Sequence, residues 1–157
     1  MGCAPSNHVK LSVQPYAYKH HYVLRICGYT NSLYQTASSA VLYFEGHSIA
    51  SDSIAHEDEK NATVVAYMIG LDMAQTHTLN MKLLIESHDM EFLNLVESDR
   101  FHSNPYYKSI VALEHKFVKI EYNQIASKHN MTAIRLCRDA IYFKSLEENR
   151  KKELNIM

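Results

Sequence analysis

A buried strand that passes directly into a helix constrains the fold of this chain more than any other feature of its sequence. Residues 79–87 (LNMKLLIES) are predicted to form a strand, and the apolar run at its centre is typical of a strand inside a sheet. In residues 88–97 (HDMEFLNLVE) the apolar side chains return at helical spacing instead. The junction brings His88, Asp89 and Glu91 together, so it is also the first candidate for a functional site.

The remaining elements form a run of strands before this junction and an alternating series after it. Predicted strands cover residues 21–29, 39–55 (a hairpin that turns at Glu45 and Gly46) and 117–125. Predicted helices cover residues 62–77, residues 106–116 and a last segment from Met131, with Asn130 as its N-cap. This order implies an α/β fold with a mixed five-stranded sheet: three antiparallel strands, then parallel strands, with helices on both faces.

Length and composition favour one globular domain. The chain has 157 residues, of which 46% are hydrophobic and 21% charged, and its formal net charge is −1. Because surfaces that bind phosphate backbones are usually basic, this charge counts against nucleic-acid binding. We expect residues 1–20 to form a flexible tether, residues 21–147 the domain, and residues 148–157 a charged helical tail.

The cysteines and the apolar runs indicate the compartment. Cys3, Cys27 and Cys137 lie far apart and show neither a zinc-binding spacing nor an even disulfide framework. This usage, without a secretory signal, predicts a cytoplasmic protein. No apolar run approaches the roughly 18 residues that a membrane span requires.

Two segments carry a resemblance to a known family. Residues 70–98 contain a Gly-Leu pair that ends a helix, a strand, and then a junction similar to "ESDS". This pattern resembles the plant ribonuclease H-like, reverse-transcriptase-like family. Residues 128–141 (KHNMTAIRLCRDAI) are similar to the closing helix of the ribonuclease H-like domain in plant RING-between-RING ubiquitin ligases. The resemblance covers residues 22–141 and implies the ribonuclease H fold.

The same resemblance implies where a catalytic ribonuclease H would hold its metal ions. Such enzymes use two metal ions bound by carboxylates, which activate the attacking water and stabilise the leaving oxygen. The four carboxylate positions fall here on Cys27, Thr63, His88 and Ile134. A thiol, a hydroxyl, an imidazole and an isoleucine do not make a magnesium site. The resemblance therefore implies a vestigial site, with no bound metal, no cofactor and no catalytic residue.

The junction leaves other interpretations open. Asp89 and Glu91 fall in the first turn of a helix, where negative charge interacts favourably with the helix dipole, and His88 suits the N-cap region. Asp89 would alternatively serve as the missing aspartate if the alignment slipped by one place. Cys27 and His88 should be neighbours, which is the minimum for a thiolate nucleophile or, with Asp89, a zinc site. The sequence shows no orienting acid and no fourth metal ligand for these two possibilities.

Two functions from different classes follow. The first is a catalytically degenerate ribonuclease H-like scaffold that binds proteins, in ubiquitin or signalling pathways as the resemblance implies. The chain is not itself such a ligase, because RING-type domains need many zinc-binding cysteines. The alternative is a nucleic-acid-binding protein, or a residual ribonuclease, that acts on RNA/DNA hybrids. Residues 56–77, the first long helix and its approach, carry more acid than base, which disfavours this alternative.

The first six residues, MGCAPS, match a lipidation signal. Gly2 after removal of Met1, with Ser6 at the required spacing, fits N-myristoylation. One myristoyl chain gives only marginal membrane binding, so a second signal is required, and Cys3 is placed for palmitoylation. We therefore expect a peripheral plasma-membrane association through Gly2 and Cys3.

Overall fold

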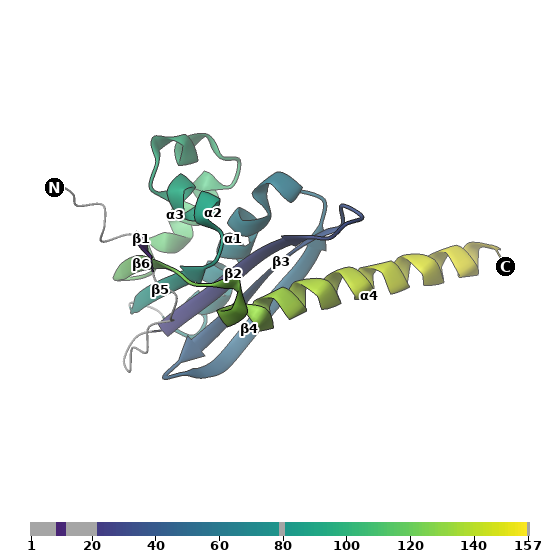
Figure 1. Cartoon of the computed structure of the whole chain (residues 1–157), viewed down its shortest axis with the longest axis horizontal. Coiled ribbons are helices and arrows are strands. Elements are labelled where there is room, and N and C mark those ends of the chain that lie inside the picture. Colours follow the sequence, from purple (N-terminus) through teal and green to yellow (C-terminus); the bar gives the residue numbers. More distant parts are fainter. Residues whose placement is uncertain (1–8, 12–21, 79–80, 157) are drawn as a thin grey trace.

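The computed structural model describes residues 9–11, 22–78 and 81–156. Within them lies a six-stranded mixed sheet in the order β1-β6-β5-β2-β3-β4 (Figure 1). Its strands are β1 (Val9–Leu11), β2 (Tyr22–Thr30), β3 (Thr36–Phe44), β4 (His47–His56), β5 (Lys82–Ser87) and β6 (Lys119–Gln124). Strands β2, β3 and β4 are antiparallel, whereas β5 pairs with β2 and β6 in parallel. The predicted mixed five-stranded sheet is confirmed, and β1 adds a sixth strand.

Strand β1 differs from the prediction of an irregular tether over residues 1–20. It pairs in parallel with β6, so that Val9 lies beside Tyr122. Three residues are too few for a strand period to be recognised in the sequence. The rest of the predicted tether, at residues 1–8 and 12–20, lies outside the described residues.

The hairpin between β3 and β4 forms as its turn residues predict. Glu45 and Gly46 both have positive φ angles, 51° and 82°. This backbone conformation is that of a two-residue turn whose twist matches that of the flanking strands. Glycine adopts it without strain, and Phe44 and His47 pair on either side of the turn.

Helices cover both faces of the sheet, as predicted. The helices are α1 (Ala62–Gln75), α2 (Met90–Val96), α3 (Tyr107–Glu114) and α4 (Met131–Ile156), with short 3₁₀ helices η2 (Glu59–Asn61), η3 (Asp99–Ser103) and η4 (Ser127–His129). Figure 1 shows α1, α2 and α3 on one face and α4 across the other. Among the described residues, no helix combines the length and the apolar character needed to cross a bilayer.

Strand β2 contributes to two separate cores because its successive side chains point to opposite faces. Leu24 and Ile26 belong to the larger core, beneath α1, α2 and α3. Cys27 belongs to a smaller core with residues of α4, among them Ile134 and Cys137. The side chain at position 27 therefore faces α4.

Two glycines hold α1 close to the sheet. A Cβ atom at Gly70 would lie 2.8 Å from Leu24 Cδ2 and 2.9 Å from the Ala40 Cβ. A Cβ atom at Gly28 would overlap the backbone of Ala62 and Thr63, at the start of α1. Only a residue without a side chain lets β2 and α1 approach this closely. This approach fixes Thr63 beside the end of β2.

Candidate functional site

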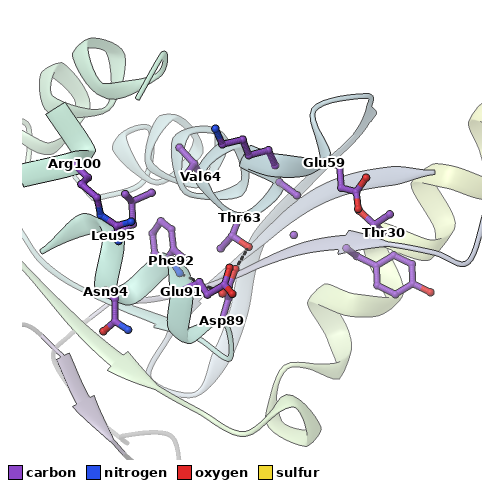
Figure 2. A pocket seen from close by; sticks show the side chains of 14 residues that line it. Thr30, Glu59, Thr63, Val64, Asp89, Glu91, Phe92, Asn94, Leu95 and Arg100 are labelled. Carbon is purple, nitrogen blue, oxygen red and sulfur yellow. Dashed lines mark hydrogen bonds between the residues drawn. The ribbon is translucent and has the colours of Figure 1, made fainter. Parts of the chain in front are cut away.

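A hollow of about 580 Å³ lies where the end of β2 meets the start of α1 and helix α2. Figure 2 shows Thr63 and Asp89 side by side in it, with Glu91 next to Asp89 and Arg100 farther away, beyond Leu95. The strands that lead to it, β2 and β5, are parallel neighbours, so both end at this edge of the sheet. Clefts at the carboxyl ends of parallel strands are common binding sites.

Asp89 starts helix α2, and both of its carboxylate oxygens accept hydrogen bonds. It is the N-cap: its Oδ1 accepts a hydrogen bond from the Phe92 backbone N–H at 3.2 Å. Its Oδ2 accepts a bond from the Thr63 hydroxyl at 2.7 Å, and its own N–H donates to the Ser87 hydroxyl at 3.0 Å. Asp89, and not His88, therefore occupies the N-cap, and Glu91 lies in the first turn as predicted.

His88 contacts the last helix. Its Nδ1 accepts a hydrogen bond from the Asn130 side-chain amide at 3.0 Å, and the same amide donates to the Ile26 carbonyl at 2.8 Å. Burial lowers the pKa of His88, and Asp89 opposes this only in part. The imidazole is therefore neutral at pH 7, with its proton on Nε2. Neutral and hydrogen-bonded, His88 holds the junction against the start of α4.

Asn130 occupies the predicted N-cap position of α4, but its side chain does not cap the helix. Its carbonyl accepts the first helical bond from the Ile134 N–H at 3.1 Å, as an N-cap residue should. Its side chain, however, is turned toward Ile26 and His88 instead of the first turn of α4. It is 1% exposed and serves to connect α4 with β2.

Cys27 lies in a setting that disfavours a nucleophile. The Cys137 thiol contacts the Cys27 carbonyl at 3.5 Å and the Ser39 hydroxyl at 3.2 Å. The hydrogen bond with the Cys137 side chain raises the pKa of the Cys27 thiol most, and burial raises it further. A thiolate nucleophile requires the opposite shift. The Cys27–His88 nucleophile therefore gains no support.

Ile134 is buried, as an isoleucine absorbed into the core should be. It is 8% exposed and shares the smaller core with Cys27. The preceding residue, Ala133, accepts a bond from the Ser39 hydroxyl at 2.6 Å.

Two of the four positions that the resemblance implies, Cys27 and Ile134, are thus packed in the core beneath α4. The other two, Thr63 and His88, are hydrogen-bonded to Asp89 and Asn130. In the part of the chain that the structure describes, no three His, Cys, Asp or Glu side chains gather to hold a metal.

Sequence reasoning missed a group of three residues, Ser38, His56 and Asp58, that lies beside Ala62 at the start of α1. The His56 Nδ1 accepts a bond from the Asp58 backbone N–H at 3.0 Å, so the proton lies on Nε2. Nε2 then donates to Ser38 Oγ at 2.7 Å, and that hydroxyl donates to the Ala62 carbonyl. A general base would need a free lone pair on Nε2. The group is structural: it ties the start of α1 to β3 and β4.

The fold is shared with solved ribonuclease H structures. The N-terminal RNase H domain of a Mycobacterium tuberculosis protein matches with a TM-score of 0.66 and 17% identity, covering 82% of this chain and 99% of that one. RNase H1 from Halobacterium salinarum matches with a TM-score of 0.67 and 13% identity over 77% and 97%. LC11-RNase H1, solved in complex with an RNA/DNA hybrid, matches with a TM-score of 0.67 and 14% identity over 80% and 99%. No protein-family model and no curated protein matches the sequence.

Proposed function

We propose that this chain is a catalytically degenerate ribonuclease H-like module that binds a protein partner. The observation that carries the proposal is the state of the four positions where the resemblance implies metal-binding carboxylates. Cys27 and Ile134 are core residues, Thr63 donates to Asp89, and His88 accepts from Asn130. Because each position has a structural role, the fold is retained without a carboxylate cluster.

The charges around the hollow support a protein partner over a phosphate backbone. Glu59 and Glu91 are exposed on its rim with Lys60 and Arg100, and Asp89 lies within it. The lining thus carries one more acidic than basic side chain, whereas nucleic-acid grooves are strongly basic. Interspersed charges of both signs suit the polar rim of a protein interface.

The alternative remains a hybrid-binding protein or a residual hybrid ribonuclease. It is favoured by the fold, since one of the similar structures holds an RNA/DNA hybrid. The two functions differ in ligand. If the partner is a protein, a charge-reversed pair, Glu91→Lys with Arg100→Glu, should release a protein that the intact chain retains from cell extract, and the intact chain should not retain labelled hybrid. Retention of labelled hybrid by the intact chain, weakening steeply with salt, would support the alternative instead.

We predict that the purified chain does not cleave RNA/DNA hybrids in magnesium or manganese. Titration with either ion should also leave the melting temperature unchanged, because no carboxylate cluster binds the ion in the folded state. A labelled hybrid and differential scanning fluorimetry provide the two measurements. The control is Asp89→Asn, which removes the acid nearest to the implied site. Cleavage by the wild type that Asp89→Asn abolishes would show that Asp89 has replaced a lost ligand.

We further propose that lipids on Gly2 and Cys3 tether the module to the plasma membrane. Both residues lie outside the described residues, so the proposal is supported by the sequence MGCAPS alone. A myristoyl chain at Gly2 would give weak, reversible binding, and a palmitoyl chain at Cys3 would make it stable. The described domain would then be presented at the cytoplasmic surface.

A fluorescent protein fused to the C-terminus tests the tether. We predict a plasma-membrane rim for the wild type and diffuse signal for Gly2→Ala, which cannot be myristoylated. Cys3→Ser should shift the signal to internal membranes, because one acyl chain alone holds weakly. The same diffuse pattern for all three proteins would exclude lipidation.

A further inference from the structure

The second half of α4 leaves the domain. Figure 1 shows it extending past the sheet toward the C-terminus, and every residue from Leu146 to Asn155 is exposed. This segment is about 15 Å long, since an α-helix rises 1.5 Å per residue. A partner that packs on this segment would bury apolar side chains that are now exposed.

Large apolar side chains are exposed in this segment and in the turn of α4 just before it. Tyr142 is 60% exposed, Phe143 61% and Leu154 67%. A hollow of about 920 Å³ follows the same helix, between α4 and strand β4 at the edge of the sheet. The β4 wall includes the small residues Ser53 and Ala55, which leave room for a close neighbour.

Four residues of α4 form one face with a self-complementary order. Phe143, Glu147, Arg150 and Leu154 follow one another at intervals of four, three and four residues, the spacing of a helix–helix contact. The first three of them also line the hollow. The face reads apolar, acidic, basic, apolar. Read in the opposite direction, the order is apolar, basic, acidic, apolar. Two antiparallel copies of the face therefore place acidic opposite basic and apolar opposite apolar.

We propose that this face binds a second copy of the chain, with the two α4 helices antiparallel about a two-fold axis. The axis places Phe143 opposite the second copy's Leu154 and Glu147 opposite its Arg150, and each contact occurs twice. A parallel pair would instead place Glu147 opposite Glu147 and Arg150 opposite Arg150. Charge therefore favours the antiparallel direction over the parallel one.

The hollow beside β4 accommodates the end of the second helix. In the antiparallel arrangement, the turn that carries Leu154 lies over Phe143, close to Ser53 and Ala55. One pair of short helices covers less than the roughly 800 Å² per partner of a standard interface, so we expect a dissociation constant in the micromolar range. The dimer does not depend on the proposed function, because the hollow that contains Asp89 and Glu91 is lined by other residues.

Sedimentation velocity on the full chain, from about 1 to 100 µM, tests the dimer. The wild-type mass should rise from 18.1 kDa toward twice that value. Glu147→Arg and Arg150→Glu should each weaken the dimer at least about tenfold, because like charges then face each other across the axis. An equimolar mixture of the two variants should dimerise, since opposite charges meet in both contacts of the mixed pair. The double variant, with both substitutions in one chain, should dimerise for the same reason.

Lys152→Glu is the matched control, because its charge reversal lies on the other side of the helix and should leave the dimer intact. Circular dichroism and melting temperature verify that each variant remains folded. The mixture separates the dimer from helix stability, since it restores charge pairs between chains but none within a chain. A wild type that stays monomeric throughout, or a mixture no more associated than its two components, would overturn the proposal.

Discussion

Replacing Glu86 by alanine should lower the free energy of unfolding by about 3–5 kcal/mol, one of the two largest effects that we expect in this protein. Glu86 is fully buried on β5. Its Oε1 accepts a hydrogen bond from Arg25 Nε at 3.0 Å, and its Oε2 accepts one from the Asn123 amide at 2.9 Å. Arg25 also donates to the His129 carbonyl at 3.1 Å and lies over the Tyr43 ring. The carboxylate thus joins β2, β5 and β6.

The alanine variant is costly because it leaves the partners of Glu86 in place. Arg25, whose side chain is only 21% exposed, would keep its charge without the carboxylate, and the buried Asn123 amide would lose its acceptor. Glu86→Gln, which keeps the shape and one acceptor oxygen, should cost less, about 1–3 kcal/mol. Urea unfolding of both variants measures the difference.

A double-mutant cycle separates the ion pair from packing. Arg25→Met with Glu86→Leu removes both charges together, so the double variant should lose less stability than the sum of the two single substitutions. Additive losses would show that the Arg25–Glu86 pair contributes no coupling energy, and that the cost of Glu86→Ala comes from the lost Asn123 bond and from packing.

Elements with a local signal were predictable from the sequence. The turn at Glu45 and Gly46 follows from the preference for positive φ at a two-residue hairpin turn, which depends on adjacent residues alone. The apolar run of β5 and the helical spacing of α2 are likewise properties of neighbouring residues. The prediction that Cys27 and His88 are neighbours requires the strands that precede them to lie side by side, and the structure shows β2 and β5 as a parallel ladder.

Contacts between residues distant in sequence were not predictable. Asparagine is a favoured N-cap residue, yet the side-chain amide of Asn130 donates a hydrogen bond to the carbonyl of Ile26, 104 residues away. Arg25 and Glu86 are 61 residues apart, and no pattern in either strand indicates that the two charges meet. The same limit applies within the candidate site. Sequence reasoning placed Thr63 and Asp89 separately, but their hydrogen bond depends on how closely α1 approaches β2 at Gly28.

Ile134→Asp should be the second severe change, with a loss of about 3–5 kcal/mol and no gain of hybrid cleavage. The resemblance implies that an active enzyme has an aspartate at this position. Here the residue is 8% exposed in a core with Cys27 and Cys137. A carboxylate placed there loses its hydration, and neither thiol compensates it as a cation or a metal would. Cleavage should not return, because Cys27, Thr63 and His88 would still lack carboxylates.

Two matched variants separate the charge from the loss of volume. Ile134→Val removes one methylene and should cost about 0.5–1.5 kcal/mol, whereas Ile134→Asn introduces a polar side chain of the same shape as aspartate without its charge.

The stability of the Asp variant should also depend on pH. Burial raises the pKa of a carboxyl, so the folded Asp variant binds its proton more tightly than the unfolded chain does. Its stability therefore falls as pH rises above the unfolded value of about 3.9, and the gap between Asp and Asn variants should be wider at pH 7 than near pH 4. Both variants contain His56 and His88, so the contribution of these histidines to the pH dependence of stability cancels when the variants are compared at the same pH. An Asp variant as stable as the Asn variant at pH 7 would mean that water reaches position 134, and the site beneath α4 would then still be open.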